Sequence, residues 1–281
     1  MRLTVVIPAL DEAATISAVV GGCLAQPDVE RVIVVDDGSA DQTAAAARGA
    51  GASLLYNDAT LGKGASLSRG MAAALAAGAT HIATLDGDGQ HRPEDLPRLL
   101  AASRAWPGRI VIGSRRARGA TAPSARRRAN RVADFWISWA AGHPIDDTQS
   151  GFRIYPAALL RALAGHPPAA AGFAFESEIL IRAARAGFTT VAVDVPAIYD
   201  ASRPSHFRPV ADITRIVIMV GAVLLRRGMD PRGLWRSLTL PRSQSAQSDE
   251  TAPQDPKLAA RLEEPGPAVR QSRHSPKSSD R

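Results

Sequence analysis

Short apolar segments alternate with helix-like segments along most of the chain. Residues 3–7, 31–35 and 82–85 have the β-branched and aliphatic composition of buried strands, and helix-like segments rich in Ala lie between them. Strands that alternate with helices favour a mostly parallel sheet with helices on both faces. The sequence therefore predicts an α/β fold.

Acidic residues follow each of these three strands. They are Asp11 and Glu12, Asp36 and Asp37, and Asp86 and Asp88. Because ligands of open α/β sheets bind outside the carboxyl ends of the strands, we expect these side chains to line one site. Solvated turns are the alternative, since Asp and Gly are common in turns, but that explanation would have to hold three times.

Asp86 and Asp88 lie one residue apart where the third of these strands ends. The strand period of two directs both carboxylates to the same side. Two close carboxylates repel each other, which raises one pKa unless a cation lies between them, and a hard divalent ion is the usual one. Gly87 and Gly89 leave the backbone accessible to a bulky anion. This motif indicates a site for a metal and a phosphate group.

The chain carries a formal charge of +7, and the segment 243–281 has six basic and six acidic residues, so the excess lies in residues 1–242. Nine arginines and no acids occur from residue 104 to residue 131. Such a segment would bind nucleotide phosphates, anionic lipid headgroups or nucleic acid. Nucleic acid is not an expected partner, because no zinc finger, helix-turn-helix or basic region with heptads is present.

Residues 1–242 are predicted to form one domain, and residues 243–281 a disordered tail rich in Ser, Gln, Pro and charge. The single cysteine, Cys23, excludes an internal disulfide, and no signal-like leader precedes the first strand. We therefore expect a cytoplasmic location. The longest apolar run, residues 216–225, is shorter than the roughly 20 residues of a spanning helix.

Six motifs occur in order along residues 3–210. They are Val-Ile-Pro-Ala-Leu-Asp-Glu at 6–12, Val-Val-Asp-Asp-Gly-Ser-Ala-Asp-Gln-Thr at 34–43, Leu-Gly-Lys-Gly at 61–64, Leu-Asp-Gly-Asp-Gly-Gln-His at 85–91, Gly-Ser-Arg at 113–115 and Asp-Thr-Gln-Ser-Gly-Phe-Arg at 147–153. In this order they resemble the family-two inverting glycosyltransferases of GT-A fold. The resemblance is strongest to the polyprenyl-phosphate (dolichyl-phosphate) mannosyl- and glucosyltransferases.

The resemblance implies roles for individual residues. The nucleotide-sugar site would comprise Pro8, Asp11, Glu12, Val35, Asp37, Lys63, Asp86, Gly87, Asp88 and Arg115. Mg or Mn would be held by Asp86, Asp88 and Gln90. The acceptor would be bound by Arg126, Asn130, Ser150, Arg153, Ser205 and His206, with Arg127 and Arg128 as alternatives to Arg126. Asp88, Arg115 and Arg126 are the predicted catalytic residues.

The absence of two motifs bears on the acceptor. Relatives that build polysaccharides carry a Thr-Glu-Asp and a Gln-x-x-Arg-Trp motif, and neither occurs here. A sugar hydroxyl needs a general base, whereas a phosphate monoester is already ionised. We therefore expect a polyprenyl phosphate acceptor that attacks the anomeric carbon of a nucleotide-sugar donor directly, with inversion. The alternative is a glycan or a lipid without phosphate, with Glu176 or Glu178 as base; an ordinary acidic first helical turn would also explain these glutamates.

Residues 210–236 combine an apolar helical segment with Arg226, Arg227, Arg232, Trp235 and Arg236. This composition is typical of a helix on an anionic membrane surface, so we expect a protein peripheral to the inner face of the cytoplasmic membrane. A core helix packed on the sheet is the alternative. A membrane partner subunit is the other candidate for binding this region.

Overall fold

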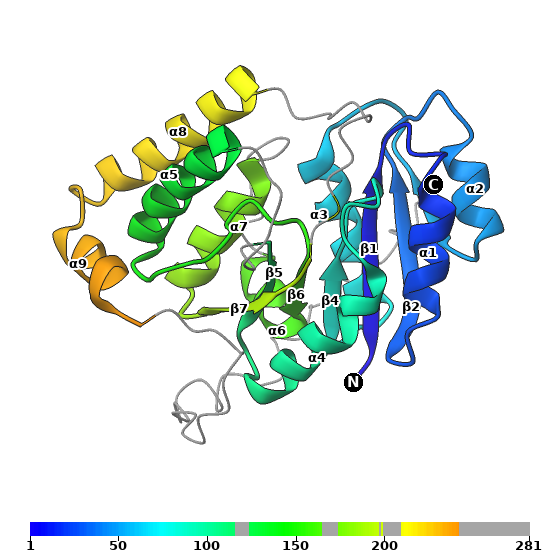
Figure 1. The fold of residues 1–281 in the computed structure, drawn as a ribbon, viewed down its shortest axis with the longest axis horizontal. Coiled ribbons are helices and arrows are strands. Elements are labelled where there is room, and N and C mark those ends of the chain that lie inside the picture. The colour runs from blue at the N-terminus through cyan, green and yellow to red at the C-terminus, as the bar shows by residue number, and fades with distance from the viewer. Residues whose placement is uncertain (116–123, 165–173, 197, 199–208, 242–281) are drawn as a thin grey trace, which may run out of the picture.

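The computed structural model describes residues 1–115, 124–164, 174–196, 198 and 209–241. Seven strands form one sheet in the order β3-β2-β1-β4-β6-β5-β7 (Figure 1). Their bounds are β1 Leu3–Ala9, β2 Val29–Asp36, β3 Ser53–Tyr56, β4 His81–Thr84, β5 Ile110–Ser114, β6 Arg153–Pro156 and β7 Thr190–Asp194. Only β6 runs antiparallel to its neighbours, β4 and β5. The predicted mostly parallel α/β sheet is confirmed.

Helices cover both faces of the sheet. They are α1 Ile16–Leu24, α2 Thr43–Gly49, α3 Lys63–Ala76, α4 Leu96–Ala105, α5 Ser124–Ala141, α6 Ala157–Leu163, α7 Ala174–Arg185, α8 Pro209–Arg226 and α9 Pro231–Thr239, with a 3-10 turn at Pro93–Asp95 before α4. Val5 and Ile7 of β1 pack in one core with α1, α2 and α4. Val6 packs in the other core with α3, and α5 to α8 extend that core. The strand period of two thus builds two apolar layers from one strand.

The parallel strands β2, β1 and β4 are adjacent, and their carboxyl ends point to the same edge of the sheet. Ala9 of β1 pairs with Asp36 of β2, and Val6 pairs with Thr84 of β4. The loops that follow these strands therefore leave the sheet along the same edge. Asp36, at the end of β2, and these loops carry the three predicted acidic pairs.

Helix α8 packs against α5 and α7 through Ile216, Val220 and Leu224, which are buried. The alternative of a core helix is therefore correct for this face of α8, whereas other apolar side chains of α8 are exposed. Among the described helices, none is both long and apolar enough to span a bilayer. The domain bounds 1–242 and the tail 243–281 stay predictions, since residues from 242 onward lie outside the described ranges.

Candidate active site

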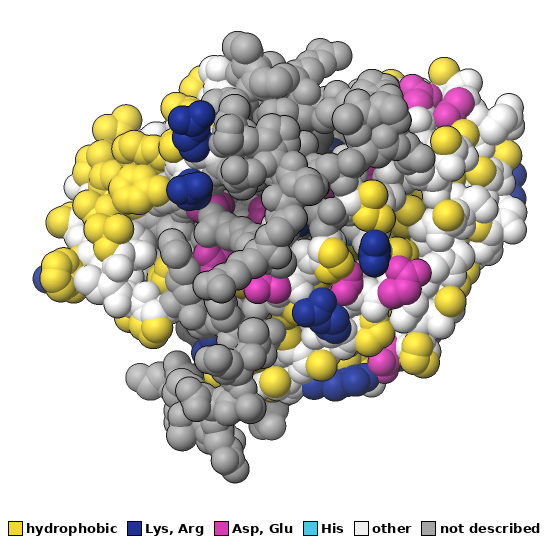
Figure 2. Space-filling view, viewed as in Figure 1, with side chains coloured by type: hydrophobic (Ala, Val, Ile, Leu, Met, Phe, Trp, Pro, Cys, Tyr) yellow, Lys and Arg dark blue, Asp and Glu magenta, His cyan; other side chains and the backbone are white. Residues whose placement is uncertain are grey.

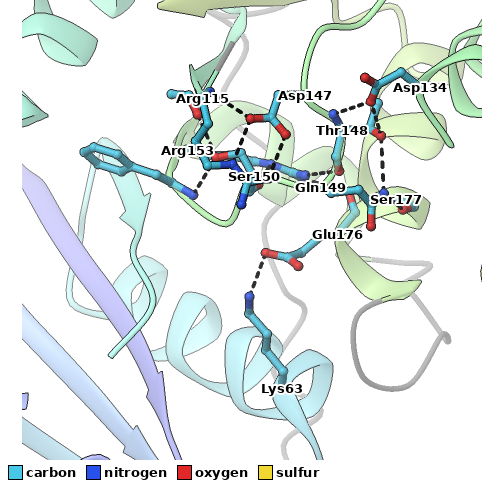
Figure 3. A network of polar contacts seen from close by, with 12 residues as sticks. Lys63, Arg115, Asp134, Asp147, Thr148, Gln149, Ser150, Arg153, Glu176 and Ser177 are labelled. Carbon is cyan, nitrogen blue, oxygen red and sulfur yellow. Dashed lines mark hydrogen bonds and ion pairs between the residues drawn. The ribbon is translucent and has the colours of Figure 1, made fainter. Parts of the chain in front are cut away.

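The ammonium group of Lys63 lies between two carboxylates from distant parts of the chain. Its Nζ is 3.1 Å from Glu176 Oε1, as Figure 3 shows, and 2.6 Å from Asp86 Oδ1. Burial alone would lower the pKa of Lys63, but Asp86 and Glu176 outweigh it and raise that pKa. Burial would raise the pKa of Asp86, but the charge and hydrogen bond of Lys63 outweigh it and lower that pKa. Lys63 and Asp86 are therefore both charged at neutral pH.

Asp37 positions Lys63 through the loop before α3. Its carboxylate accepts hydrogen bonds from the backbone N–H groups of Leu61 and Gly62, at 3.0 and 2.7 Å, and from Asn57 Nδ2 at 2.6 Å. Gly62 has a φ of +91°, which suits glycine. Asp37 is buried, with 3% of its surface exposed. Its carboxylate therefore fixes the turn from which Lys63 reaches the strand ends.

Asp88 lies beside Asp86 in the turn after β4, where its Oδ1 accepts a 2.9 Å hydrogen bond from the Gln90 backbone N–H. Burial and the negative charge of Asp86 raise the pKa of Asp88. Two hard-oxygen ligands that repel each other fit a divalent cation. No group of three or more His, Cys, Asp and Glu in the described ranges could hold a metal. Gln90 and substrate oxygens would therefore have to complete the coordination.

Side chains from outside the segment hold residues 147–151, the 147–151 loop, in place (Figure 3). Arg115, which follows β5, donates from Nε and one terminal nitrogen to the Asp147 carboxylate at 2.9 and 2.7 Å, and its backbone N–H adds a 2.8 Å bond. Burial would raise the pKa of Asp147, but Arg115 outweighs it and lowers that pKa. Asp134 of α5 accepts from the Thr148 N–H and hydroxyl.

The 147–151 loop lies directly against the acidic cluster. A Cβ added to Gly151 would lie 2.7 Å from Asp86 Oδ2 and 2.9 Å from Glu176 Oε1. The Thr84 hydroxyl, at the end of β4, donates to the Gly151 carbonyl at 2.7 Å. Only glycine leaves room for both carboxylates here, so this loop forms one wall of the site.

Three predicted site residues have a different role from the one expected. Arg153 and Ser150 are fully buried, and Arg153 donates to three backbone carbonyls while the Ser150 hydroxyl donates to the Gly113 carbonyl at 2.6 Å. The prediction that these two side chains contact the acceptor is therefore wrong. The Val35 side chain is also fully buried, in the core with α3, so it does not line the donor site.

The β1–α1 and β2–α2 loops are bound to each other. Asp11, with a φ of +54°, accepts a 2.8 Å hydrogen bond from the Ala40 N–H, and its own N–H donates to Ser39 Oγ at 3.0 Å. Glu12 lies beside Gly87, where an added Cβ would be 3.5 Å from Glu12 Cγ. Pro8, at the end of β1, is half-buried. These residues lie along the predicted edge, and their contact with a nucleotide stays a prediction.

The predicted acceptor residues are only partly described. Arg126 lies in the first turn of α5, but its side chain is outside the described part, whereas Asn130 is half-buried on the same helix. Ser205 and His206 lie outside the described residues. The two glutamates of α7 differ: Glu176 faces Lys63, whereas Glu178 binds Arg182 at 2.6 Å.

His91 is a buried residue whose environment the sequence did not reveal. Its ring packs on Phe152 with the ring centroids 5.3 Å apart, and its Nδ1 has no hydrogen-bond partner among the described protein atoms. Burial and the charge of Arg115 lower the pKa of His91 to about 4, so the ring is neutral at physiological pH. Asp134 and Asp147 were likewise not predicted as site residues, because no spacing in the sequence links them to the strand ends.

The open α/β sheet with paired carboxylates and a lysine at its strand ends agrees with the GT-A glycosyltransferase fold that the sequence motifs predict. The family model described as "Glycosyl transferase family 2" matches residues 4–163. The chain therefore belongs to glycosyl transferase family 2.

This chain matches two named relatives over most of their length. The undecaprenyl-phosphate mannosyltransferase of Micrococcus luteus is 30% identical over 203 residues, which are 69% of this chain and 83% of the relative. The polyprenol monophosphomannose synthase of Mycolicibacterium smegmatis is 29% identical over 203 residues, which are 69% and 76% of the two chains.

Solved structures support the fold. The mannosyl-3-phosphoglycerate synthase of Rubrobacter xylanophilus has a TM-score of 0.64 at 20% identity and covers 86% of this chain and 79% of its own. A glucosyl-3-phosphoglycerate synthase of Mycobacterium tuberculosis, solved with Mn2+, UDP-glucose and phosphoglyceric acid, has a TM-score of 0.57 at 26% identity, with coverage of 82% and 80%.

Proposed function

We propose that this glycosyltransferase moves a hexose from a nucleoside diphosphate sugar to a polyprenyl phosphate, with inversion at the anomeric carbon. The similarity to the Micrococcus luteus enzyme carries the proposal, because its name specifies an undecaprenyl phosphate and 83% of its length is matched. The Mycolicibacterium smegmatis relative is likewise named for a polyprenol monophosphomannose product.

The donor end of the site follows from the acidic cluster. Asp86, Asp88 and Gln90 would hold Mg or Mn, and this cation would neutralise the charge that develops on the departing nucleoside diphosphate. Lys63, held between Asp86 and Glu176, adds a positive charge at the same strand ends. Pro8, Asp11, Glu12 and Asp37 would bind the nucleoside, and Asp37 also holds the loop that carries Lys63.

The acceptor end needs positive charge more than a base. One oxygen of the acceptor phosphate forms the new bond to the anomeric carbon, while the bond from that carbon to the donor diphosphate breaks and its electron pair leaves with the diphosphate. Arg126 and Asn130 of α5 would orient the acceptor phosphate. Arg115 would contribute charge beside the site while it holds Asp147.

A polyprenyl chain stays in the bilayer, while a nucleotide sugar is dissolved in water. We therefore propose that the protein works as a peripheral protein at the inner face of the cytoplasmic membrane. The absence of a spanning helix among the described helices is compatible with this location.

A second candidate function has one observation in its favour. Glu176 lies at the site beside Lys63, so it could serve as a general base for a glycan or non-phosphate lipid hydroxyl. Glu178 is a poorer candidate, because its ion pair is with Arg182 one turn along α7, whereas Glu176 shares Lys63 with Asp86 at the strand ends. Glu176→Gln, with Glu178→Gln as the matched control, separates the two functions. Lost turnover with unchanged donor affinity in Glu176→Gln alone would favour a base mechanism.

A donor panel tests the proposed function. GDP-mannose, UDP-glucose, UDP-GlcNAc and UDP-galactose are each offered with undecaprenyl phosphate and with Mg or Mn. One donor is expected to give a glycolipid, and Asp88→Asn is expected to abolish that product. No product from any pairing, with folded protein, would refute the proposal.

A further inference from the structure

Large apolar side chains are exposed on α5 and on the two helices that pack against it, α8 and α9. Figure 2 shows apolar side chains gathered over this end of the molecule, with basic side chains beside them. We call the following residues the docking face: Phe135, Trp136, Ile218, Leu225, Trp235 and Leu238. Single exposed apolar residues are normal on a protein surface, but a contiguous group marks an interaction site.

Packing within the protein does not account for the docking face. On α8, Ile216, Val220 and Leu224 are buried in the core, whereas Ile218 and Leu225 are 65% and 72% exposed. The last two are seven residues apart, so they lie two turns apart on the same side of the helix, away from the buried side. A core helix needs one apolar stripe, and α8 has a second one.

The aromatic residues of α5 and α9 show the same division. Trp139 is buried, and its indole nitrogen donates to the Asp230 carbonyl at 3.1 Å, which ties α5 to the start of α9. Phe135 and Trp136 contact the Trp139 ring, with centroids 6.2 and 5.3 Å from it, yet both remain 40% exposed. Trp235 of α9 is 70% exposed. Exposed indole rings beside apolar side chains suit the interface between lipid and water.

The positive charge of α5, α8 and α9 indicates what binds the docking face. Exposed arginines on the same three helices are Arg128, Arg131, Arg215, Arg226, Arg232 and Arg236. Among the described side chains of these helices, the only acid is Asp134, which is buried and bonded to Thr148. Two copies of so basic a surface would repel each other, whereas anionic lipid headgroups attract it.

We infer that the docking face binds the surface of an anionic bilayer, with its apolar side chains in the headgroup region and its arginines among the lipid phosphates. The inference rests on the proposed lipid acceptor and names the surface that meets the membrane. Helix α5 contributes to both regions, since Asp134 holds the 147–151 loop while Phe135 and Trp136 belong to the docking face. Docking would therefore bring a membrane-bound phosphate to the edge of the active site.

Vesicle sedimentation of the full-length protein tests this inference. The vesicles contain phosphatidylcholine alone or with phosphatidylglycerol, and no polyprenyl phosphate. The triple variant Ile218→Ser, Leu225→Ser, Trp235→Ser is compared with Leu24→Ser, which removes an exposed leucine from α1. Wild type and Leu24→Ser are expected to bind the anionic vesicles, and the triple variant about ten-fold or more weakly. Circular dichroism and thermal melting verify that each variant is folded.

Turnover of a short, water-soluble isoprenyl phosphate separates this inference from the proposed function. The triple variant is expected to turn over the short acceptor as the wild type does, because none of its changes lies at the active site. Equal vesicle binding by wild type and triple variant, or no vesicle binding by the wild type, would overturn the inference that the docking face binds the membrane. The proposed function would still stand if the protein turns over the short acceptor. A third outcome would assign the docking face to a protein and also overturn the inference. In that outcome the wild type does not bind bare vesicles, but it self-associates or co-purifies with a membrane subunit, and the triple variant loses that association.

Discussion

Arg153, the first residue of β6, binds both polar segments that face the strand ends. Its guanidinium donates at 2.7 Å to the carbonyls of Thr148, Ser150 and Glu176, and at 3.2 Å to the Tyr155 hydroxyl. Two of these carbonyls belong to the 147–151 loop and one to the first turn of α7. Arg153 is therefore a positioning residue: it sets the distance between the wall formed by Gly151 and the carboxylate of Glu176.

Arg153→Met is expected to destabilise the protein by about 3 kcal/mol or more, because it leaves three buried carbonyls without a donor. Tyr155→Phe removes one hydrogen bond of the same network and should cost about 1 kcal/mol. Urea unfolding followed by circular dichroism measures both. Normal stability of Arg153→Met together with a selective loss of acceptor affinity would restore the direct acceptor role that burial excludes.

The Arg115–Asp147 pair predicts a pH dependence of stability. Arg115 holds the pKa of Asp147 below its ordinary 3.8, so the stabilisation is complete above that pH and is lost as the pH falls through the lower folded-state pKa. Wild type should therefore lose stability below about pH 4 more steeply than Asp147→Asn. Unfolding free energies from pH 7 to pH 3 provide the comparison. Identical slopes for the two proteins would show that the pair does not stabilise the fold.

The residue types of the site could be predicted from the sequence more readily than their contacts. Asp86 and Asp88 were identifiable because strand period and strand end are local features. The pairing of Lys63 with Glu176 was not, since it joins α3 to α7, two neighbouring helices that are far apart in the sequence. The motif that contains Ser150 and Arg153 was recognised, but burial depends on the packing of β6 and α7, and so the direct acceptor role assigned to both was wrong.

At the scale of elements, the predicted strands and helices agree with the structure where the apolar pattern is long. The Ala-rich segment before the strand at 82–85 forms Lys63–Ala76, and the apolar helical segment within residues 210–236 forms Pro209–Arg226. The antiparallel direction of β6 was not predicted, because a four-residue strand carries no signal of direction. Helix α9 was also missed, although Pro231 at its first turn and the Asp230 carboxylate, which caps the Gly233 N–H, are recognisable start signals.

Glycines test the packing of helices on the sheet. Gly70 of α3 faces β1 and β2: an added Cβ would lie 3.0 Å from Val35 Cγ2 and closer still to Val6 Cγ1. Gly70→Ala should therefore destabilise by about 1–3 kcal/mol through overpacking, despite the better helix propensity of alanine. Gly21→Ala in α1, where nothing lies within 4 Å, should stabilise by about 0.5–1 kcal/mol. Chemical denaturation measures the change in the free energy of unfolding for both variants. A Gly70→Ala variant more stable than the wild type would contradict the close packing.

At the scale of the whole molecule, the active site is formed by residues from both halves of the sheet. The β1, β2 and β4 side supplies Asp37 and Asp86, whereas the β5, β6 and α7 side supplies Arg115, the 147–151 loop and Glu176. Lys63 bridges the two sides through its ion pairs. The helices that carry the docking face pack on the second side, so donor chemistry and membrane contact are built from different parts of one sheet.

Removal of residues 243–281 tests the predicted domain boundary. The truncated protein is expected to melt at the same temperature as the full chain and to retain its turnover, because the described contacts of the site all lie before residue 242. Differential scanning calorimetry and glycolipid formation provide the two readouts. A lower melting temperature or lost turnover would extend the functional domain into the tail.

Acceptor choice tests the central claim most directly. The donor that proves active is offered with undecaprenyl phosphate and, in parallel, with the same polyprenol lacking its phosphate and with a soluble glycan, and the products are identified by mass spectrometry. We expect a hexosyl phosphate lipid from the first acceptor and no product from the other two. Transfer to the free polyprenol or the glycan, with undecaprenyl phosphate left unused, would contradict the claim.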